Sequence, residues 1–327
     1  MPTVTLPQGY TARPPTLADA AAVANLIAAC QQATGDKATM TTEEQANDWQ
    51  GLDLADEAVL ITAPDGQIAG YADLYNRRYV RVSVYGYTHP SYRGHGIGAY
   101  LAQWGETWTR ERIGRAPTGA RVVVEQYIRT TNDSAIRLMQ TRGYAPVRGI
   151  YVMAITLDAP PPIPAPPANI SIRAFIPGAD ERATFDAVEE AFQDTWNRPP
   201  GIFERWLAMT KIERADPGLW FLAIDQPTGE IAGVSLGKIA AGEGWIGAVG
   251  VRRPWRNRGL ALALLHATFA EYYRQGVREV NLSVDAESPT GAPRLYSRAG
   301  MRVAQSYALY RTELRAGTDL LPSHESV

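Results

Sequence analysis

The sequence is poor in the residues that build disulfide frameworks and metal centres. Cys30 is the single cysteine, so the chain cannot form a disulfide within itself. Its place in an apolar helical run, away from the motifs described below, favours a packing residue over a nucleophile. The four histidines show no spacing typical of metal ligands, and we therefore expect no metal site.

Long apolar runs and a large excess of one charge are missing as well. No segment is long and apolar enough to cross a bilayer, and no signal-peptide core follows Met1. We therefore expect a cytoplasmic protein without a membrane partner. The formal net charge of −2 argues against a nucleic-acid-binding surface, so we expect no nucleic-acid partner.

The sequence does contain enough apolar residues, 45% of the chain, for ordinary globular cores. A length of 327 residues suggests about two domains. Residues in matching contexts recur about 160 positions apart, so the repeated unit is a whole domain. The matching pairs are Arg13 with Arg173, Arg93 with Arg256, and Gly143 with Gly300.

The domain limits follow from this repeat and from one proline-rich run. We expect an N-terminal domain over residues 1–157 and a C-terminal domain over 169–315. Residues 158–168 hold the proline-rich run and are expected to form a semi-rigid linker. Residues 316–327 are expected to be a polar, disordered tail.

One stretch in each half combines an extended strand, a glycine-containing turn and the start of a helix. In the second half, 245–249 is extended, and Leu260, Leu264, Leu265 and Phe269 recur at helical spacing. Gly259 has no Cβ, which lets a ligand approach the backbone closely. The unpaired N–H groups of a helix N-terminus favour an anion, so this turn is suited to hold a pyrophosphate.

The two turns read Arg-x-x-Gly-x-Ala over 256–261 and Arg-x-x-Gly-x-Gly over 93–98. Both resemble the acyl-CoA signature of the GNAT N-acetyltransferase superfamily. The resemblance implies an α/β (α+β) fold of two tandem GNAT-like acyl-CoA N-acyltransferase domains. Each would have a mixed, mostly antiparallel sheet flanked by helices. It also implies acetyl-CoA as co-substrate, without a metal.

The resemblance implies which residues bind the co-substrate. The strand residues Val249 and Val251 would contact the pantetheine and the acyl oxygen, and Ser288 would donate a hydrogen bond to the pantetheine. The pyrophosphate would lie on Arg256, Arg258, Gly259, Leu260, Ala261 and Leu262. The matching residues of the first half are Arg93, His95, Gly96, Ile97, Gly98 and Ala99. The alternative for both Arg256 and Arg258 is a solvated turn residue.

The leaving thiolate needs a proton donor, and this requirement distinguishes the halves. Family members commonly have a tyrosine in a Leu-Tyr-x-x-x-Gly pattern, which Tyr296 matches in the second half. Met139 occupies that place in the first half and cannot donate a proton. The alternative role for Tyr296 is packing on an amphipathic helix.

The general base and the acceptor site are less sharply defined. A carboxylate acting through water is one route, and Glu243, Asp285 and Glu287 are equally ranked candidates. Clustered aromatic residues of the second half predict either an apolar acceptor slot or core packing. These residues are Phe192, Trp196, Phe203, Trp206 and Trp245.

These observations favour an acetyl-CoA-dependent N-acetyltransferase that modifies a primary amine on a small molecule. Transfer would be direct and would take place in the C-terminal half, with the N-terminal half catalytically degenerate. Three alternatives stay open: activity in both halves, a non-catalytic acyl-CoA sensor, and a protein-lysine acetyltransferase.

Overall fold

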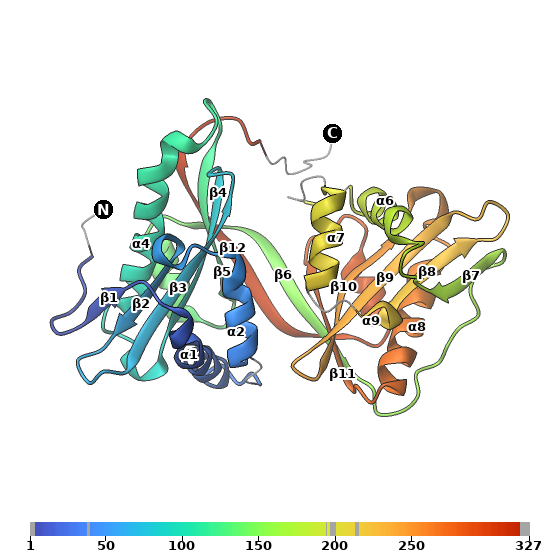
Figure 1. The fold of residues 1–327 in the computed structure, drawn as a ribbon, viewed down its shortest axis with the longest axis horizontal. Coiled ribbons are helices and arrows are strands. Elements are labelled where there is room, and N and C mark those ends of the chain that lie inside the picture. The colour runs from blue at the N-terminus through green and yellow to red at the C-terminus, as the bar shows by residue number, and fades with distance from the viewer. Residues whose placement is uncertain (1–3, 38–39, 194, 197–200, 213–215, 321–327) are drawn as a thin grey trace. The chain divides into compact units, whose positions relative to one another are not determined.

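The computed structural model describes residues 4–37, 40–193, 195–196, 201–212 and 216–320, without the side chains of 209–212. The chain forms two compact units. Unit 1 consists of Met1–Arg148 together with Tyr307–Leu320, and unit 2 is built on Gly149–Ser306. In each unit, neighbouring strands form sheet structure with helices on its two faces (Figure 1).

The sheet of unit 1 has the strand order β1-β2-β3-β4-β5-β12. Strands β4 and β5 pair in parallel, and the other neighbours pair antiparallel. The elements are β1 (Thr11–Arg13), α1 (Ala20–Gln32), α2 (Thr42–Asp48), α3 (Leu54–Glu57), β2 (Ala58–Thr62), β3 (Ile68–Arg77), β4 (Arg81–Thr88), α4 (Ile97–Arg112), β5 (Val122–Arg129), α5 (Asp133–Thr141) and β12 (Arg302–Arg315).

The sheet of unit 2 has the order β6-β11-β10-β9-β8-β7, with β10 and β11 parallel. The mixed, mostly antiparallel sheet predicted for each half is therefore confirmed. The elements are β6 (Ala145–Thr156), β7 (Ile170–Ala174), α6 (Glu181–Phe192), α7 (Phe203–Ile212), β8 (Trp220–Asp225), β9 (Ile231–Ala240), β10 (Glu243–Val251), α8 (Leu260–Arg274), β11 (Glu279–Asp285) and α9 (Ala292–Arg298).

The two units exchange their closing strands. Strand β6 follows the helices of unit 1 but pairs with β11 of unit 2, whereas β12, near the end of the chain, pairs with β5 of unit 1. The compact units therefore differ from the predicted domains 1–157 and 169–315. The proline-rich run 158–168 joins β6 to β7, which pair with β11 and β8 of unit 2, rather than one unit to the other.

The start of the predicted tail is ordered. Thr318 donates its N–H to Gly119 O at 2.8 Å and accepts from Arg121 N at 2.8 Å. Asp319 lies 3.5 Å from the buried Arg81 guanidinium. These contacts add residues 316–320 to unit 1, so the expectation of a disordered tail is wrong for them, and 321–327 lie outside the described residues.

The repeated arginines at the start of each half have the same structural role. Arg13 makes a bidentate ion pair with Asp19, at 2.7 and 2.8 Å, just before α1. Arg173 makes the equivalent pair with Asp180 before α6. In both pairs the guanidinium lowers the pKa of the carboxyl group. Thr16 and Asp19 also form a capping box at this point.

Apolar spacing predicts the buried face of α8 correctly. Leu260, Leu264, Leu265 and Phe269 are all buried against the sheet. Full burial of each such side chain contributes about 1.5–3 kcal/mol. The Tyr272 hydroxyl, one turn further on, lies within 3.0 Å of carbonyl oxygens on β9 and β10. Helix α8 is thereby fixed against the strand that leads into its own N-terminus.

Candidate active site

Both predicted turns adopt the same backbone conformation. Gly96 and Gly259 are left-handed N-cap residues, with φ of 80° and 81°, of α4 and α8. Two positions earlier, Gly94 and Asn257 are also left-handed, with φ of 85° and 63°. Left-handed residues spaced in this way turn successive N–H groups toward one side and create a concave anion site.

The helix N-termini behind these glycines are open to a ligand. Neither helix has a side-chain cap, so the first N–H groups of each have no intrahelical partner. A Cβ built on Gly96 or Gly259 would have no atom within 4 Å. This geometry fits the pyrophosphate-binding role expected of Leu260, Ala261 and Leu262 and of the matching residues 97–99.

The arginine side chains of the second turn have different roles. Arg256 donates from Nε to Val251 O and from Nη2 to Ala191 O, both at 3.1 Å. It joins the end of α6 to the end of β10, so it is neither a solvated turn residue nor a side chain directed only at a phosphate. Arg258 is exposed and fits a flexible contact to an anion.

The first turn is held in a similar way. The Nδ1 atom of the exposed His95 lies 2.8 Å from the Tyr10 hydroxyl oxygen. The Cys30 thiol donates to Thr88 O, at the end of β4, at 3.2 Å. Cys30 is therefore close to the first motif, and the expectation that it lies away from the motifs is wrong. Burial raises the pKa of this thiol, which opposes thiolate formation.

The strands that lead into the two turns differ by one residue. In β10 the register with β9 shifts between Ile246 and Ala248, which leaves Gly247 as the extra residue of a bulge. Strand β4 pairs with β3 from Arg81 to Thr88 without any shift. A bulge interrupts the hydrogen-bond ladder and bends the strand, so β10 has a local irregularity that β4 lacks.

The bulge lies where β10 separates from β11. The register of these strands pairs Gly244 with Val280 and Trp245 with Asn281, and it ends there. Beyond this point, the backbone up to Val251 has β9 on one side and no strand partner within the described chain on the other. Val249 and Val251, predicted to contact pantetheine, stand on this free edge.

Tyr296 lies on α9 and is 7% exposed. It packs among the apolar residues of the unit 2 core, so the packing role is real. Burial alone raises the pKa of its phenol to about 12, which keeps the group protonated at neutral pH. Met139 is 1% exposed at the same place on α5, with no proton to donate.

The structure separates the candidate bases. Glu243 accepts a hydrogen bond from Asn281 at 2.9 Å, and it stands six residues before Val249, about 20 Å along an extended strand. Asp285 ends β11 four residues after Asn281, which places it near the level of Val249. Its Oδ1 accepts from Glu287 N at 2.9 Å, and Glu287 itself accepts from Gly149 N at 3.4 Å.

The turn before α9 differs from its counterpart in unit 1. Asn132 is the N-cap of α5 and accepts from Ala135 N at 3.2 Å. Ser288 does not cap α9, because the N-cap is the left-handed Gly291. The Ser288 hydroxyl lies 3.0 Å from the Thr290 hydroxyl at an exposed position, where it is available to a ligand.

Two aromatic side chains close the corresponding position in unit 1, and only Tyr85 of the two stands out in the sequence, as one of several first-half aromatics suited to either packing or a slot. Tyr85 on β4 and Tyr127 on β5 stack, with ring centroids 6.2 Å apart, just beyond the last parallel pair of these strands. Their counterparts in unit 2 are the smaller Ala248 and Ser283. This correspondence holds when Gly247 is counted as an extra residue of unit 2, without a partner in unit 1. Asp285 corresponds to Arg129, which forms an ion pair with Asp36.

The aromatic residues of the acceptor region mainly pack. Phe203 and Trp206 on α7 contact Phe185 on α6, with ring centroids 5.5 and 5.8 Å away. Trp206 also contacts Trp220, whose indole donates to Gly237 O at 3.0 Å. Phe192 packs against the same core, whereas Trp196 and Trp245 are half-buried.

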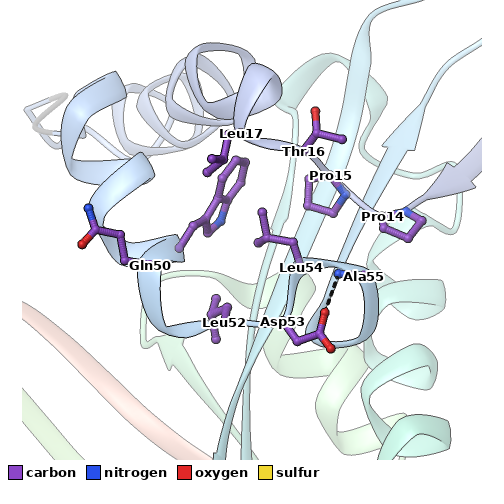
Figure 2. Close-up of a pocket in the computed structure, with 10 residues that line it drawn as sticks. Pro14, Pro15, Thr16, Leu17, Gln50, Leu52, Asp53, Leu54 and Ala55 are labelled. Atoms are coloured by element: carbon purple, nitrogen blue, oxygen red, sulfur yellow. Dashed lines mark hydrogen bonds between the residues drawn. The ribbon is translucent and has the colours of Figure 1, made fainter.

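A recess of about 550 Å³ lies in unit 1 (Figure 2). Its walls come from the segment before α1 and from the α2–α3 region, with Trp49 between them. It contains none of the predicted site residues. Among the described residues, no cluster of His, Cys, Asp or Glu is arranged to hold a metal ion, and no helix is long and apolar enough to span a membrane.

Comparison with known proteins agrees with this geometry. The model of the acetyltransferase (GNAT) family matches twice, over residues 21–144 and 182–301. A mycothiol acetyltransferase of Arthrobacter sp. (strain FB24) is 30% identical over 265 residues, which are 79% of this chain and 74% of that protein. The chain belongs to the acetyltransferase (GNAT) family, and it is an N-acetyltransferase with two tandem domains.

Solved structures share the fold. A crystal structure of a GCN5-related N-acetyltransferase from Sphaerobacter thermophilus is 60% identical, with a TM-score of 0.90 over 98% of this chain and all of that one. A tandem GNAT protein from the clavulanic acid biosynthesis pathway has a TM-score of 0.74 at 16% identity, over 94% of this chain and all of that one. The tandem arrangement is similar to that of mycothiol synthase, in agreement with the relatives named mycothiol acetyltransferase.

Proposed function

We propose that unit 2 transfers an acetyl group from acetyl-CoA directly to a primary amine on a small molecule. The observation that carries this proposal is the bulge at Gly247, in the strand that leads into an uncapped helix N-terminus. The bulge lies where β10 separates from β11, which leaves the backbone edge of β10 free. Unit 2 thus combines this free edge with an anion site at the start of α8 and the Tyr296 phenol on α9.

Acetyl-CoA fits the residues present and supplies the activated acetyl group. The N–H groups at the start of α8 bind its pyrophosphate, and Arg258 adds positive charge from the solvent side. The free edge of β10 at Val249 and Val251 binds the extended pantetheine by backbone hydrogen bonds. Gly259 makes this close approach possible because nothing lies near its missing Cβ.

Two side chains move protons in the proposed reaction. The attacking amine must be neutral, and Asp285, at the level of Val249, accepts the proton released as the new C–N bond forms. The bond from the acetyl carbon to sulfur breaks, and the Tyr296 phenol donates its proton to the leaving sulfur. Tyr296 then recovers a proton from solvent. Neither step needs an enzyme thiol.

The matching features of unit 1 support binding without transfer. Its turn has the same left-handed glycine and uncapped helix as that of unit 2. However, Met139 replaces the acid, Arg129 replaces the carboxylate, and the Tyr85–Tyr127 stack fills the place next to β4. We therefore propose that unit 1 binds acyl-CoA as a degenerate site.

A small-molecule acceptor is supported by the similarity to relatives named mycothiol acetyltransferase. The first experiment is titration calorimetry of acetyl-CoA into the wild type and into two matched variants, Gly259→Glu and Gly96→Glu. Each places a carboxylate at one helix N-terminus, where it repels the pyrophosphate.

We expect both variants to lose one binding event. In thiol-release assays with a panel of primary amines, Gly259→Glu alone should abolish turnover. Turnover that survives Gly259→Glu and is lost in Gly96→Glu would assign transfer to unit 1. An absence of acetyl-CoA binding by the wild type would refute the proposal as a whole.

A further inference from the structure

Unit 1 contains a half-buried carboxylate on the sheet face that carries α1 and α2. Asp73 lies on β3, and its Oδ2 accepts a hydrogen bond of 2.6 Å from the Tyr71 hydroxyl. Tyr71 is almost fully buried, and its hydroxyl accepts in turn from Trp49 Nε1 at 2.7 Å. This chain of two hydrogen bonds fixes the orientation of the carboxylate.

The carboxylate lies beside exposed aromatic rings. Asp73 is the cross-strand partner of Tyr85 on β4, so the two side chains share one face of the sheet. Tyr85 and Tyr127 are stacked but remain 39% and 38% exposed. Aromatic side chains of this size are normally buried more fully, so the stack presents π-electron surface to a ligand.

No cation in the described part of the chain neutralises this carboxylate. Within the described chain, Asp73 forms no ion pair with a lysine or arginine, and its Oδ1 has no hydrogen-bond partner. Burial accordingly raises the pKa of Asp73 to about 6, so it is still mainly ionised at neutral pH. A half-buried negative charge with one oxygen that no protein group occupies favours binding of a cation from outside.

Unit 2 has no such arrangement at the corresponding positions. Val234 takes the place of Tyr71, Leu236 that of Asp73, and Ala248 that of Tyr85. The carboxylate and its tyrosines are therefore specific to unit 1. Beside the bulge of unit 2 lie the small and apolar side chains Ala248 and Leu236, whereas the same positions in unit 1 hold Tyr85 and the Asp73 carboxylate.

We propose that Asp73, Tyr71, Tyr85 and Tyr127 form a binding site for the primary ammonium group of a small organic molecule. The ammonium donates a charge-assisted hydrogen bond to Asp73 Oδ1, and its alkyl chain lies against the Tyr85–Tyr127 stack, with a cation–π contribution. The site binds without transferring an acetyl group, since unit 1 has no acid at Met139. It does not depend on catalysis by unit 2.

Trp49 provides a local reporter of this site. Its indole N–H donates to Tyr71, so a ligand on Asp73 alters the indole ¹H–¹⁵N signal of Trp49 through one intervening hydroxyl. The experiment titrates n-butylammonium into the full-length protein, with n-butanol as the neutral analogue of similar size. Trp49→Phe assigns the signal.

We expect a saturable shift of the Trp49 signal with n-butylammonium and none with n-butanol. Asp73→Asn should weaken binding at least about ten-fold, since a hydrogen bond to a charged group contributes about 1.5–3 kcal/mol. Asp65→Asn is the matched control. Asp65 also accepts from a tyrosine, Tyr92, at 2.6 Å, but on the open surface of unit 1, so this variant should bind normally.

Several results would overturn the proposal: no shift, an equal shift with n-butanol, or unchanged affinity in Asp73→Asn. If Asp73→Asn does not fold, the exposed Tyr85→Leu decides, with an expected loss of about three-fold or more. Asp285→Asn should leave the Trp49 shift intact. That variant separates this ammonium site from an amine bound at the proposed active site of unit 2.

Discussion

The chemistry proposed at Tyr296 depends on one buried hydroxyl. Tyr296→Phe removes the proton donor without changing the shape of the core, so we expect kcat to fall about 100-fold with little change in KM for acetyl-CoA. Steady-state thiol-release kinetics measure both constants. Met139→Tyr is the companion variant and should leave kcat at its wild-type value. Full turnover in Tyr296→Phe would remove the phenol from the mechanism.

The raised pKa of Tyr296 makes a pH prediction with a defined sign. A phenol with a pKa of about 12 keeps its proton throughout the neutral and moderately alkaline range. Loss of the Tyr296 proton therefore cannot reduce kcat up to about pH 10. The pH profiles of the wild type and of Tyr296→Phe should have the same alkaline side, and an alkaline limb present in the wild type alone would contradict this.

A buried ion pair in unit 1 replaces apolar packing in unit 2. Arg142 makes two hydrogen bonds of 2.9 Å to Glu106, both side chains being buried. The corresponding residues of unit 2 are Phe269 and Ala299, both in its apolar core. The contact between α4 and the end of α5 in unit 1 is thus an ion pair, whereas the corresponding contact between α8 and the end of α9 in unit 2 is apolar.

Arg142→Ala leaves the Glu106 carboxylate buried with fewer partners, so we expect a loss of about 3–5 kcal/mol in the free energy of unfolding. The double variant Glu106→Phe with Arg142→Ala introduces the unit 2 pair and should recover most of that loss. Urea denaturation monitored by circular dichroism measures both. If the double variant is less stable than Arg142→Ala, the two helix contacts are not interchangeable.

At the scale of elements, the main difference between the halves is the bulge in β10. Deleting Gly247 should restore a regular ladder with β9, as β4 has with β3, and move the following residues by one position. Val249 and the free edge would then be misplaced, so we expect turnover to fall below detection while the protein still folds.

Gly247→Ala is the control for this deletion. Its φ is not in the left-handed region, and a new Cβ would meet only Leu236 O, at 3.7 Å. This variant keeps the extra residue and should retain activity within about two-fold. Thiol-release assays and circular dichroism distinguish the outcomes, and an active deletion variant would show that the bulge has no catalytic role.

At the scale of the molecule, the exchange of β6 and β12 makes the two halves of the sequence interdependent. A fragment ending within the proline-rich run contains β6 but lacks β12, so its β5 edge is left unpaired. Arg311 of β12 also donates to the buried Glu125 at 2.8 Å, which further links the end of the chain to unit 1.

We therefore expect fragments 1–162 and 163–327 to be insoluble or unstable when expressed singly and to co-purify when expressed together. Size-exclusion chromatography with a tag on one fragment tests this, and Arg311→Ala should weaken the association. Two stable monomeric fragments would mean that each half completes its own sheet.

The sequence by itself determines the conformation of the two glycine-containing turns at 93–98 and 256–261. They depend on local causes: glycine at left-handed positions, helix N-termini without caps, and apolar residues at helical spacing. The contrast between Tyr296 and Met139 is likewise visible in the sequence, because both residues stand at a fixed distance before a glycine at the end of a helix.

Only the tertiary structure decides the strand exchange, the bulge and the environment of the carboxylates. Alternating apolar residues show that β6 and β12 are strands, but strand partners are set by contacts between residues far apart in the chain. A single extra residue at Gly247 has no sequence signature until its register with β9 is known. Asp285 and Glu243 look equivalent in the sequence, and their level along the paired strands separates them.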